Sequence, residues 1–436
     1  MIIFVIKTIS MFDNKPVPSP QMVKKFYFLD YIFILLQSCK IYNDRDKVFL
    51  NFKTLKEKES LGESKYKKLT QELSNPSKKQ VQRYIYTFEQ VISEAVNYGL
   101  VKDRNRTLSL TETGNEYLLL GEKKKIDFYE SILQSMESRY FAFYHLIKLC
   151  YNQNKTKNGL LIFPIYSPLK LGFVKSEMKT HGDWINYSLK LKKRLETDIF
   201  SFLEQKLNLK EANDVLLGNL ISDSVLSNDK DKLFDQKLYN SIISRFRKYW
   251  LNYFLKNIYD YKYSFETFNI WVERGKQLGI IHTTEFFPDF DGRLVFPTSI
   301  IVKKNSNKDL IPVYSYKNGE TLFVHKLLWN LENQESFVEA LVYCYFDLKR
   351  SRGTHFIRIS DLRERVCYKK RIPSFVFNEF LEKIYNMNLK GETRVQISLE
   401  ADRLPHETNA MYLKREPVSI NGQFKNIVAI DYRKKQ

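Results

Sequence analysis

The segment "SKKQVQRYIYTFEQVISEAVNYGLVKDRNRTLSLTETGNEYL" (Ser77–Leu118) contains an amphipathic helix pattern followed directly by a strand pattern. Ser77 is a favourable helix N-cap, and Gln80 stands three residues later, as in a capping box. Gly99 ends the helix. Apolar side chains recur between these limits at helical spacing, and we expect them to face inward: Val81, Tyr84, Ile85, Phe88, Ile92, Ala95 and Val96.

The residues after Gly99 are predicted to form a short hairpin. "LVKD" and "TLSL" alternate in polarity around the charged turn Asp103–Arg106. Lys78 and Lys79 stand at a helix start, where cations oppose the helix dipole, and a bound phosphate would reverse that penalty. Ordinary solvated surface is the alternative. We predict that Arg83 reads a base edge. The whole predicted DNA-binding surface consists of Lys78, Lys79, Gln82, Arg83, Arg104 and Arg106.

A helix followed by a two-stranded hairpin, with the "GLV" step and the following "LTETGNEYL", resembles the winged-helix superfamily. The resemblance covers about Lys24–Leu120. It implies that the basic helix is a recognition helix, that the hairpin is its wing, and that duplex DNA is the partner. The same pattern recurs at about Leu233–Lys304 and again at about Asp347–Gln436.

In the second copy, Ser264 caps a helix whose inward residues are predicted to be Phe265, Phe268, Trp271 and Val272. Gly279 ends that helix, and a hairpin follows around Asp291-Gly292. In the third copy, Ser360 caps "DLRERVCY", and Pro373 suits the first turn of the next helix. "RVQISLEA" and "NIVAIDYRK" are expected to pair as a wing.

We therefore predict an α+β fold that is mostly α-helical, with multiple winged-helix domains and small antiparallel β-wings joined by helices. The predicted order is an N-terminal leader (1–23), a first winged-helix domain (24–120), a helical middle region with a short β segment (121–232), a second winged-helix-like domain (233–304), a helical connector (305–346) and a winged-helix-like C-terminal domain (347–436).

The composition favours a polyanionic partner. The 436 residues include 70 Lys and Arg against 50 Asp and Glu, which gives a formal net charge of +20. A Lys-rich proteome is the alternative explanation. Double-stranded DNA is the predicted partner, with RNA and partner proteins left open. The scattered Cys39, Cys150, Cys344 and Cys367 indicate reduced, buried thiols in the cytoplasm, and no apolar stretch is long enough for a membrane span.

The densest basic cluster is Lys349–Arg371, where nine Lys and Arg face two acids. Seven of the nine lie outside the helix "DLRERVC", so pairs four residues apart within one helix cannot neutralise them. We predict that DNA contacts come from Lys349, Arg350, Arg352, Arg358, Lys369, Lys370 and Arg371. A second basic segment adds Lys190, Lys192, Lys193 and Arg194.

Sequence motifs for catalysis are mostly missing. Ile270 stands where a phosphate-binding loop ending at Gly275-Lys276 would need its first glycine. "PDFDG" (Pro288–Gly292) could begin a metal-dependent nuclease motif, but no acidic-x-Lys follows at strand distance, and a hairpin turn explains it. We predict no catalytic residue, metal or cofactor.

Three interpretations remain open at this point. The first is a non-catalytic DNA-binding protein, acting as a specificity or adaptor subunit of a DNA-processing, restriction or phage-defence assembly. The second is a plasmid-type replication initiator or a restriction-type nuclease or nickase. The third is a scaffold whose winged helices bind proteins, because fold does not fix function.

Overall fold

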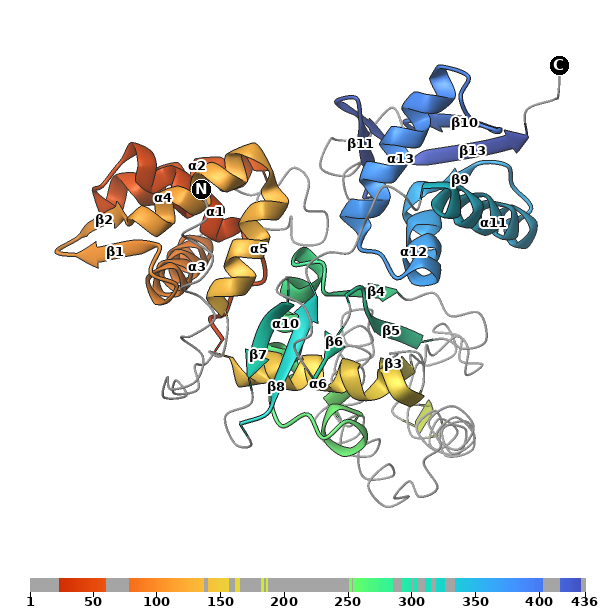
Figure 1. Ribbon diagram of the computed structural model, residues 1–436. Coiled ribbons are helices and arrows are strands. Elements are labelled where there is room, and N and C mark those ends of the chain that lie inside the picture. Colours follow the sequence, from red (N-terminus) through yellow and green to blue (C-terminus); the bar gives the residue numbers. More distant parts are fainter. Residues whose placement is uncertain are drawn as a thin grey trace, which may run out of the picture. The chain divides into compact units, whose positions relative to one another are not determined.

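The computed structural model describes residues 23–59, 78–136, 140–156, 161–164, 182–183, 186, 251–252, 254–284, 292–299, 301–303, 310–314, 319–325, 334–402 and 416–432 (Figure 1). They form a mixed α and β structure with small antiparallel sheets of two or three strands. One compact unit holds the described residues within Met1–Lys148, Ile270–His282 and Pro297–Gln436. The other holds those within Leu149–Asn269 and Thr283–Phe296.

The N-terminal part is a group of helices with one hairpin. Its elements are α1 (Asp30–Ile41), α2 (Arg45–Glu59), α3 (Lys78–Asn97), β1 (Val101–Arg104), β2 (Thr107–Leu110), α4 (Glu112–Lys123), α5 (Lys125–Met136) and α6 (Phe141–Thr156). The apolar α1 is the central helix, because the residues from Tyr31 to Leu36 are all buried. It contacts α2, α3 and α4.

Helix α3 forms where the sequence predicts it, but its buried face is narrower than predicted. Tyr84, Phe88 and Ile92 are buried, as expected. Val81, Ile85 and Val96 were predicted to face inward, and this prediction is wrong, since all three are at least 38% exposed. Helical spacing gives the residues that share a face but not how much of that face neighbouring elements cover. Ser77, the predicted cap, lies outside the described residues.

The hairpin after α3 is tighter than predicted. Gly99 ends the helix at φ +73°, a conformation that glycine adopts without strain. Arg104 pairs with Thr107, so the turn consists of Asn105 and Arg106 rather than Asp103–Arg106. Both turn residues have positive φ, which suits a two-residue turn that follows the strand twist.

The second predicted copy is described only in part. Helix α10 (Phe265–Gln277) begins after Ser264, whose hydroxyl accepts from the backbone N–H of Thr267 as predicted. A short π-helix (Phe254–Ile258) precedes it, and Gly279 follows it at φ +68°. Strands β4 (Ile281–Thr284) and β5 (Gly292–Pro297) follow and join β3 (Leu161–Pro164) in the order β3-β5-β4. The predicted turn at Asp291-Gly292 falls largely outside the described residues.

Residues 305–346 were predicted to be a helical connector, and this is wrong for the described residues before 334, whereas residues 334–346 are helical. Strands β7 (Leu310–Tyr314) and β8 (Thr321–His325) pair there, and β6 (Ile301–Val302) pairs with the far side of β8. The alternation in "LIPVY" and "TLFVH" is a strand pattern that the helical prediction overlooked. Helix α11 (Gln334–Arg352) then begins inside the predicted connector.

The C-terminal part begins with α11 and continues with β9 (Ile357–Arg358), α12 (Ile359–Lys370), α13 (Ser374–Leu389), β10 (Val395–Glu400), β11 (Val418–Ile420), β12 (Gln423–Lys425) and β13 (Ile427–Tyr432). Strands β10 and β13 pair antiparallel, as predicted, and β9 adds to the other edge of β13. Ser360 does not cap α12, which begins one residue earlier, and Pro373 is the N-cap of α13.

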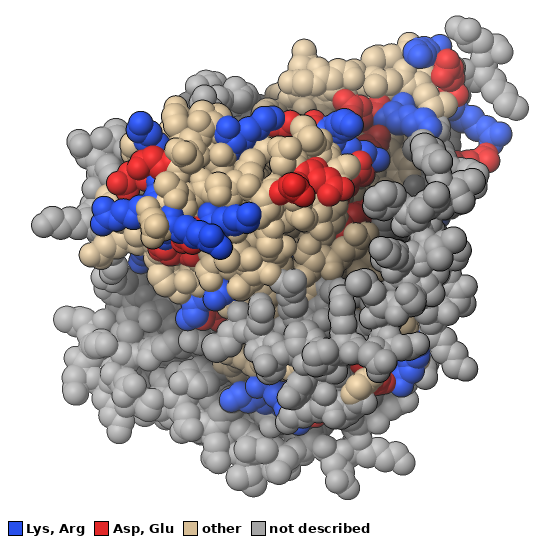
Figure 2. All heavy atoms as spheres, turned by 60° about the vertical axis from the view of Figure 1, so that its left-hand side comes forward, with Lys and Arg blue, Asp and Glu red and all other residues tan. Residues whose placement is uncertain are grey.

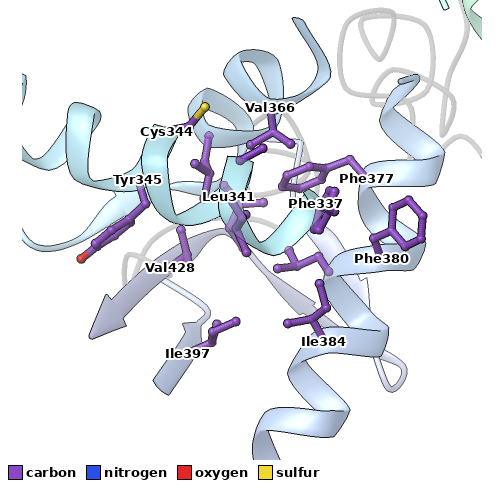
Figure 3. Close-up of a cluster of buried hydrophobic side chains, with 14 of the residues drawn as sticks. Phe337, Leu341, Cys344, Tyr345, Val366, Phe377, Phe380, Ile384, Ile397 and Val428 are labelled. Carbon is purple, nitrogen blue, oxygen red and sulfur yellow. The ribbon is translucent and has the colours of Figure 1, made fainter. Parts of the chain in front are cut away.

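One hydrophobic core joins the three helices of this part to its sheet. Figure 3 shows Phe337, Leu341 and Phe377 pointing toward one another, with Val428 on the strand beside them. All four side chains are at most 2% exposed. Because a single core joins α11, α12 and α13 to strands β9, β10, β11 and β13, the C-terminal part has its own source of hydrophobic stabilisation.

Candidate nucleic-acid interface

Arg45, at the start of α2, fixes the hairpin to α3. Its guanidinium donates to Glu89 of α3 at 2.5 Å and to Asp103 of β1 at 2.7 Å. The chain just before α2 also pairs with the hairpin, through a β-bridge between Asp44 and Thr107. The hairpin therefore has a defined position against α3, and the two elements form one continuous surface.

Helix geometry defines which part of α3 lies on this surface. Glu89 faces the hairpin, and residues three, four and seven positions earlier lie on the same side of the helix. These are Tyr86, Ile85 and Gln82, and all three are exposed. Arg83 is exposed as predicted, but it is one residue further round and therefore lies on the flank of this face.

The hairpin presents basic and hydroxyl groups on its outer side. Side chains alternate along a strand, and Val101 and Leu108 point into the core. Lys102 and Arg104 therefore point outward, opposite Ser109 and Thr107 on the paired strand. All four are exposed, and so is Arg106 in the turn. This is a combination of groups that contacts phosphates in other complexes.

The charge of this surface is positive but not continuous. Asp103 and Glu89, the acids between hairpin and helix, are both ion-paired with Arg45, whose single positive charge offsets one of their two negative charges. In contrast, Arg83, Lys102 and Arg104 form no ion pair among the described residues. Figure 2 shows a short band of Lys and Arg side chains on this side of the molecule, with acidic side chains close beside it. The band suits contact with a few phosphates rather than a long polyanion.

Much of the predicted basic cluster at Lys349–Arg371 is occupied by contacts within the protein. Acidic partners come from other elements: Arg352 is paired with Asp361, Arg365 with Asp347, and Arg363 with Glu416. The remaining predicted side chains lie in three kinds of environment. Two lysines make polar contacts, Lys349 with His355 and Lys370 with Ser336. Two cations lie over aromatic rings, Lys369 over Tyr343 and the largely buried Arg371 over Tyr368. Arg350 and Arg358 are exposed.

Other predicted residues fall outside the described side chains. Lys78 and Lys79 open α3, but the structure describes only their backbone. Lys190, Lys192, Lys193 and Arg194 lie outside the described residues altogether. The structure therefore brings together Gln82, Arg83, Arg104 and Arg106 from the predicted set.

Helix α13 corresponds to α3 in chain order, but its outer face is different. The β11–β12 hairpin lies against it, with the backbone N–H of Asn421 donating to Glu382 at 2.7 Å. The side-chain amides of Asn386 and Asn421 also bond to each other. Glu379 is the exposed residue on the neighbouring flank. An acidic and partly covered helix is poorly suited to a DNA groove.

Lys102, Tyr86 and Arg45 were missed by the sequence reasoning. A two-residue turn at Asn105-Arg106 would have placed Lys102 on the same strand face as Arg104. Tyr86 is absent from the residues that the sequence analysis predicted to face inward, and it was given no role in binding. Nothing local in the sequence indicates the Arg45 contacts, because their partners stand 44 and 58 residues away.

The described residues contain no other evident chemical site. The four cysteines are buried and unpaired, as predicted, and burial raises the pKa of the Cys344 thiol to about 11, which makes it a poor nucleophile. No group of three or more His, Cys, Asp or Glu side chains within the described ranges could hold a metal ion. None of the helices described there combines the length and apolar character that a bilayer span requires.

No protein-family model, no curated protein and no solved structure matches the chain.

Proposed function

We propose that the chain is a DNA-binding protein of winged-helix type, in which α3 is the recognition helix and the β1–β2 hairpin is the wing. The order of elements supports this assignment. In the N-terminal part a helix, a short β-bridge, two helices and a hairpin follow one another. The C-terminal part has the same order, from α11 through β9, α12 and α13 to β10 and β13.

The observation that carries the proposal is the double contact of Arg45 with α3 and β1. In winged-helix proteins the recognition helix enters the major groove while the wing reaches the adjacent backbone. The helix and the wing can contact the groove and the backbone at the same time only if their spacing is fixed. The contacts of Arg45 with both elements fix that spacing. Gln82 then faces a base edge from the hairpin side of α3, and Arg83 does so from its flank.

DNA binding in this proposal comes from the N-terminal part rather than from α13. The two helices occupy equivalent places in the element order, yet only α3 has an outer face without a covering hairpin among the described residues. Lys102, Arg104 and Arg106 supply the phosphate contacts that position the helix, and phosphate contacts carry no sequence information themselves.

The test is a binding titration on a duplex selected from a random pool and on a scrambled duplex, at matched salt. We expect Gln82→Ala and Arg83→Ala to reduce discrimination between the two duplexes by about 5- to 100-fold each. Both side chains are exposed, so the melting temperature should stay near that of the wild type. Lys123→Ala removes an exposed cation from α4 and is the charge-matched control. Wild-type binding by both variants on both duplexes would reject α3 as the reading helix.

A further inference from the structure

Two apolar side chains lie beside an amide on the exposed face of α3. Ile85 stands three residues after Gln82 and Tyr86 stands four residues after it, so both are neighbours of Gln82 on the helix surface, one on each side. Ile85 is 44% exposed and Tyr86 is 48% exposed, and Gln82 is exposed as well. We call these three residues, Gln82, Ile85 and Tyr86, the amide face.

The apolar residues of the amide face do not belong to the protein core. Tyr84 and Phe88 are the residues of this part of α3 that point into the core, and each is at most 3% exposed. A single exposed apolar side chain is common on protein surfaces. Here, however, two of them adjoin one amide in the first half of α3, and the N-terminal half of a recognition helix is the half that meets base edges.

The chemistry of the amide face matches one kind of base pair. The 5-methyl of thymine is the apolar group that bases present in the major groove. The same A·T pair presents N6 and N7 of adenine, which a glutamine amide contacts as donor and acceptor together. Gln82 therefore suits the adenine, and its apolar neighbours Ile85 and Tyr86 suit the methyl group of the paired or the adjoining thymine.

The carboxylates around the amide face are occupied within the protein. A free carboxylate would favour cytosine, because it accepts a hydrogen bond from the cytosine amino group. Helix α3 has two carboxylates: Glu94 is buried, and Glu89 is ion-paired with Arg45. Asp103, the acid of the adjoining hairpin, is paired with the same guanidinium. The groups of the amide face that remain for a base are thus one amide and two apolar side chains.

We propose that α3 recognises A·T pairs in the major groove, with Gln82 on adenine and with Ile85 and Tyr86 on thymine methyl groups. This inference rests on the proposed function and names the base pair that the helix reads. A protein partner that covered Ile85 and Tyr86 would instead leave DNA binding independent of the thymine methyl groups.

The test compares binding of the full-length protein to the duplex selected from a random pool and to the same duplex with deoxyuridine in place of every thymidine. This replacement removes the 5-methyl groups and keeps every hydrogen-bonding group and every phosphate. Burial of one methyl-sized group corresponds to about fourfold in affinity, so the wild type should bind the thymine duplex about 4- to 15-fold more tightly. Ile85→Ala/Tyr86→Ala should bind the two duplexes within about twofold of each other, because the side chains that contact the methyl groups are gone. Both side chains are exposed, so the melting temperature should stay near that of the wild type.

Val96→Ala is the matched control. Val96 is a 40% exposed apolar residue of the same helix, about three turns beyond Ile85, and its replacement should leave the preference for thymine unchanged. Equal wild-type affinity for the two duplexes, with the preference for selected over scrambled DNA retained, would overturn this inference and leave the proposed function standing. A full thymine preference in the double variant, or an equal loss of it in Val96→Ala, would also overturn the inference. Failure of the wild type to prefer any duplex would reject the proposed function and this inference together.

Discussion

The guanidinium of Arg274 donates to the carboxylate of Glu94 at 2.8 Å, and neither side chain is exposed to solvent. The two residues stand 180 positions apart, on α10 and α3. Arg274 also donates to the backbone carbonyls of Lys24 and Phe26, and the hydroxyl of Tyr98 donates to Glu94. This buried cluster connects the end of α3 to α10 and to the segment before α1.

We expect Arg274→Met to destabilise the protein by about 3–5 kcal/mol, because it leaves the Glu94 carboxylate buried without its counter-charge. The double variant Arg274→Met/Glu94→Leu should recover most of that loss, since replacing a buried pair by apolar groups of similar volume is often neutral. Thermal unfolding followed by circular dichroism gives both values. A single variant as stable as the wild type would show that solvent reaches the pair.

Trp271→Ala should cost about 3–5 kcal/mol of stability, as large-to-small changes in a core do. The indole is fully buried and its ring lies 5.0 Å from those of Tyr140 and Phe143. Phe356→Ala, which truncates a 55% exposed ring, should change stability by less than about 0.5 kcal/mol. Urea titration of both variants checks the contrast, and similar midpoints would contradict it.

Glu320 should make stability depend on pH in the acid range. Hydrogen bonds from Lys148, Lys303 and Tyr144 lower the pKa of this carboxyl from 4.5 to about 2. A group with a lowered folded-state pKa contributes stability above its unfolded value, and that contribution is lost as pH falls from about 4.5 to about 2. Glu320→Gln should therefore be less stable by about 1–2 kcal/mol at neutral pH, after allowance for solvent screening.

The difference between Glu320→Gln and the wild type should shrink below pH 4.5 and disappear near pH 2. Chemical unfolding at a series of pH values measures it. Glu339→Gln is the control, because Glu339 is exposed and has no ion pair among the described residues. A difference that stays constant down to pH 2 would mean that Glu320 acts through packing and not through its charge.

Local signals in the sequence were sufficient for individual elements. The N-cap Ser264, the glycines after α3 and α10, and the alternation in β10 and β13 all predicted the observed boundaries to within a few residues. These signals act over one turn or one strand, so they can be recognised without knowing which other elements pack against that segment.

Features that depend on contacts with residues far away in the sequence were not predictable from local signals. The exposure of Ile85 follows from the extent of the neighbouring elements and not from its periodicity. The pairing of Arg352, Arg365 and Arg363 with acids on other elements removed much of a cluster that looked unneutralised in the sequence. Ion pairs between distant residues leave no local pattern, so a basic segment by itself is weak evidence for a binding surface.

The hairpin gives the most direct test of the proposed DNA binding by the N-terminal part. Replacing Lys102, Arg104 and Arg106 together with Ala removes the cations of its outer face and turn. Each neutralised phosphate contributes about −0.9 to the slope of log K against log salt, so the slope should become shallower by about 2 to 3.

Lys40→Ala, which removes a cation already paired with Glu122, should leave the slope unchanged. Selectivity between duplexes should persist in the triple variant, because Gln82 and Arg83, the residues proposed to read bases, remain in place. An unchanged slope would mean that the hairpin does not touch the phosphates, and Arg45 would then hold it against α3 for stability alone.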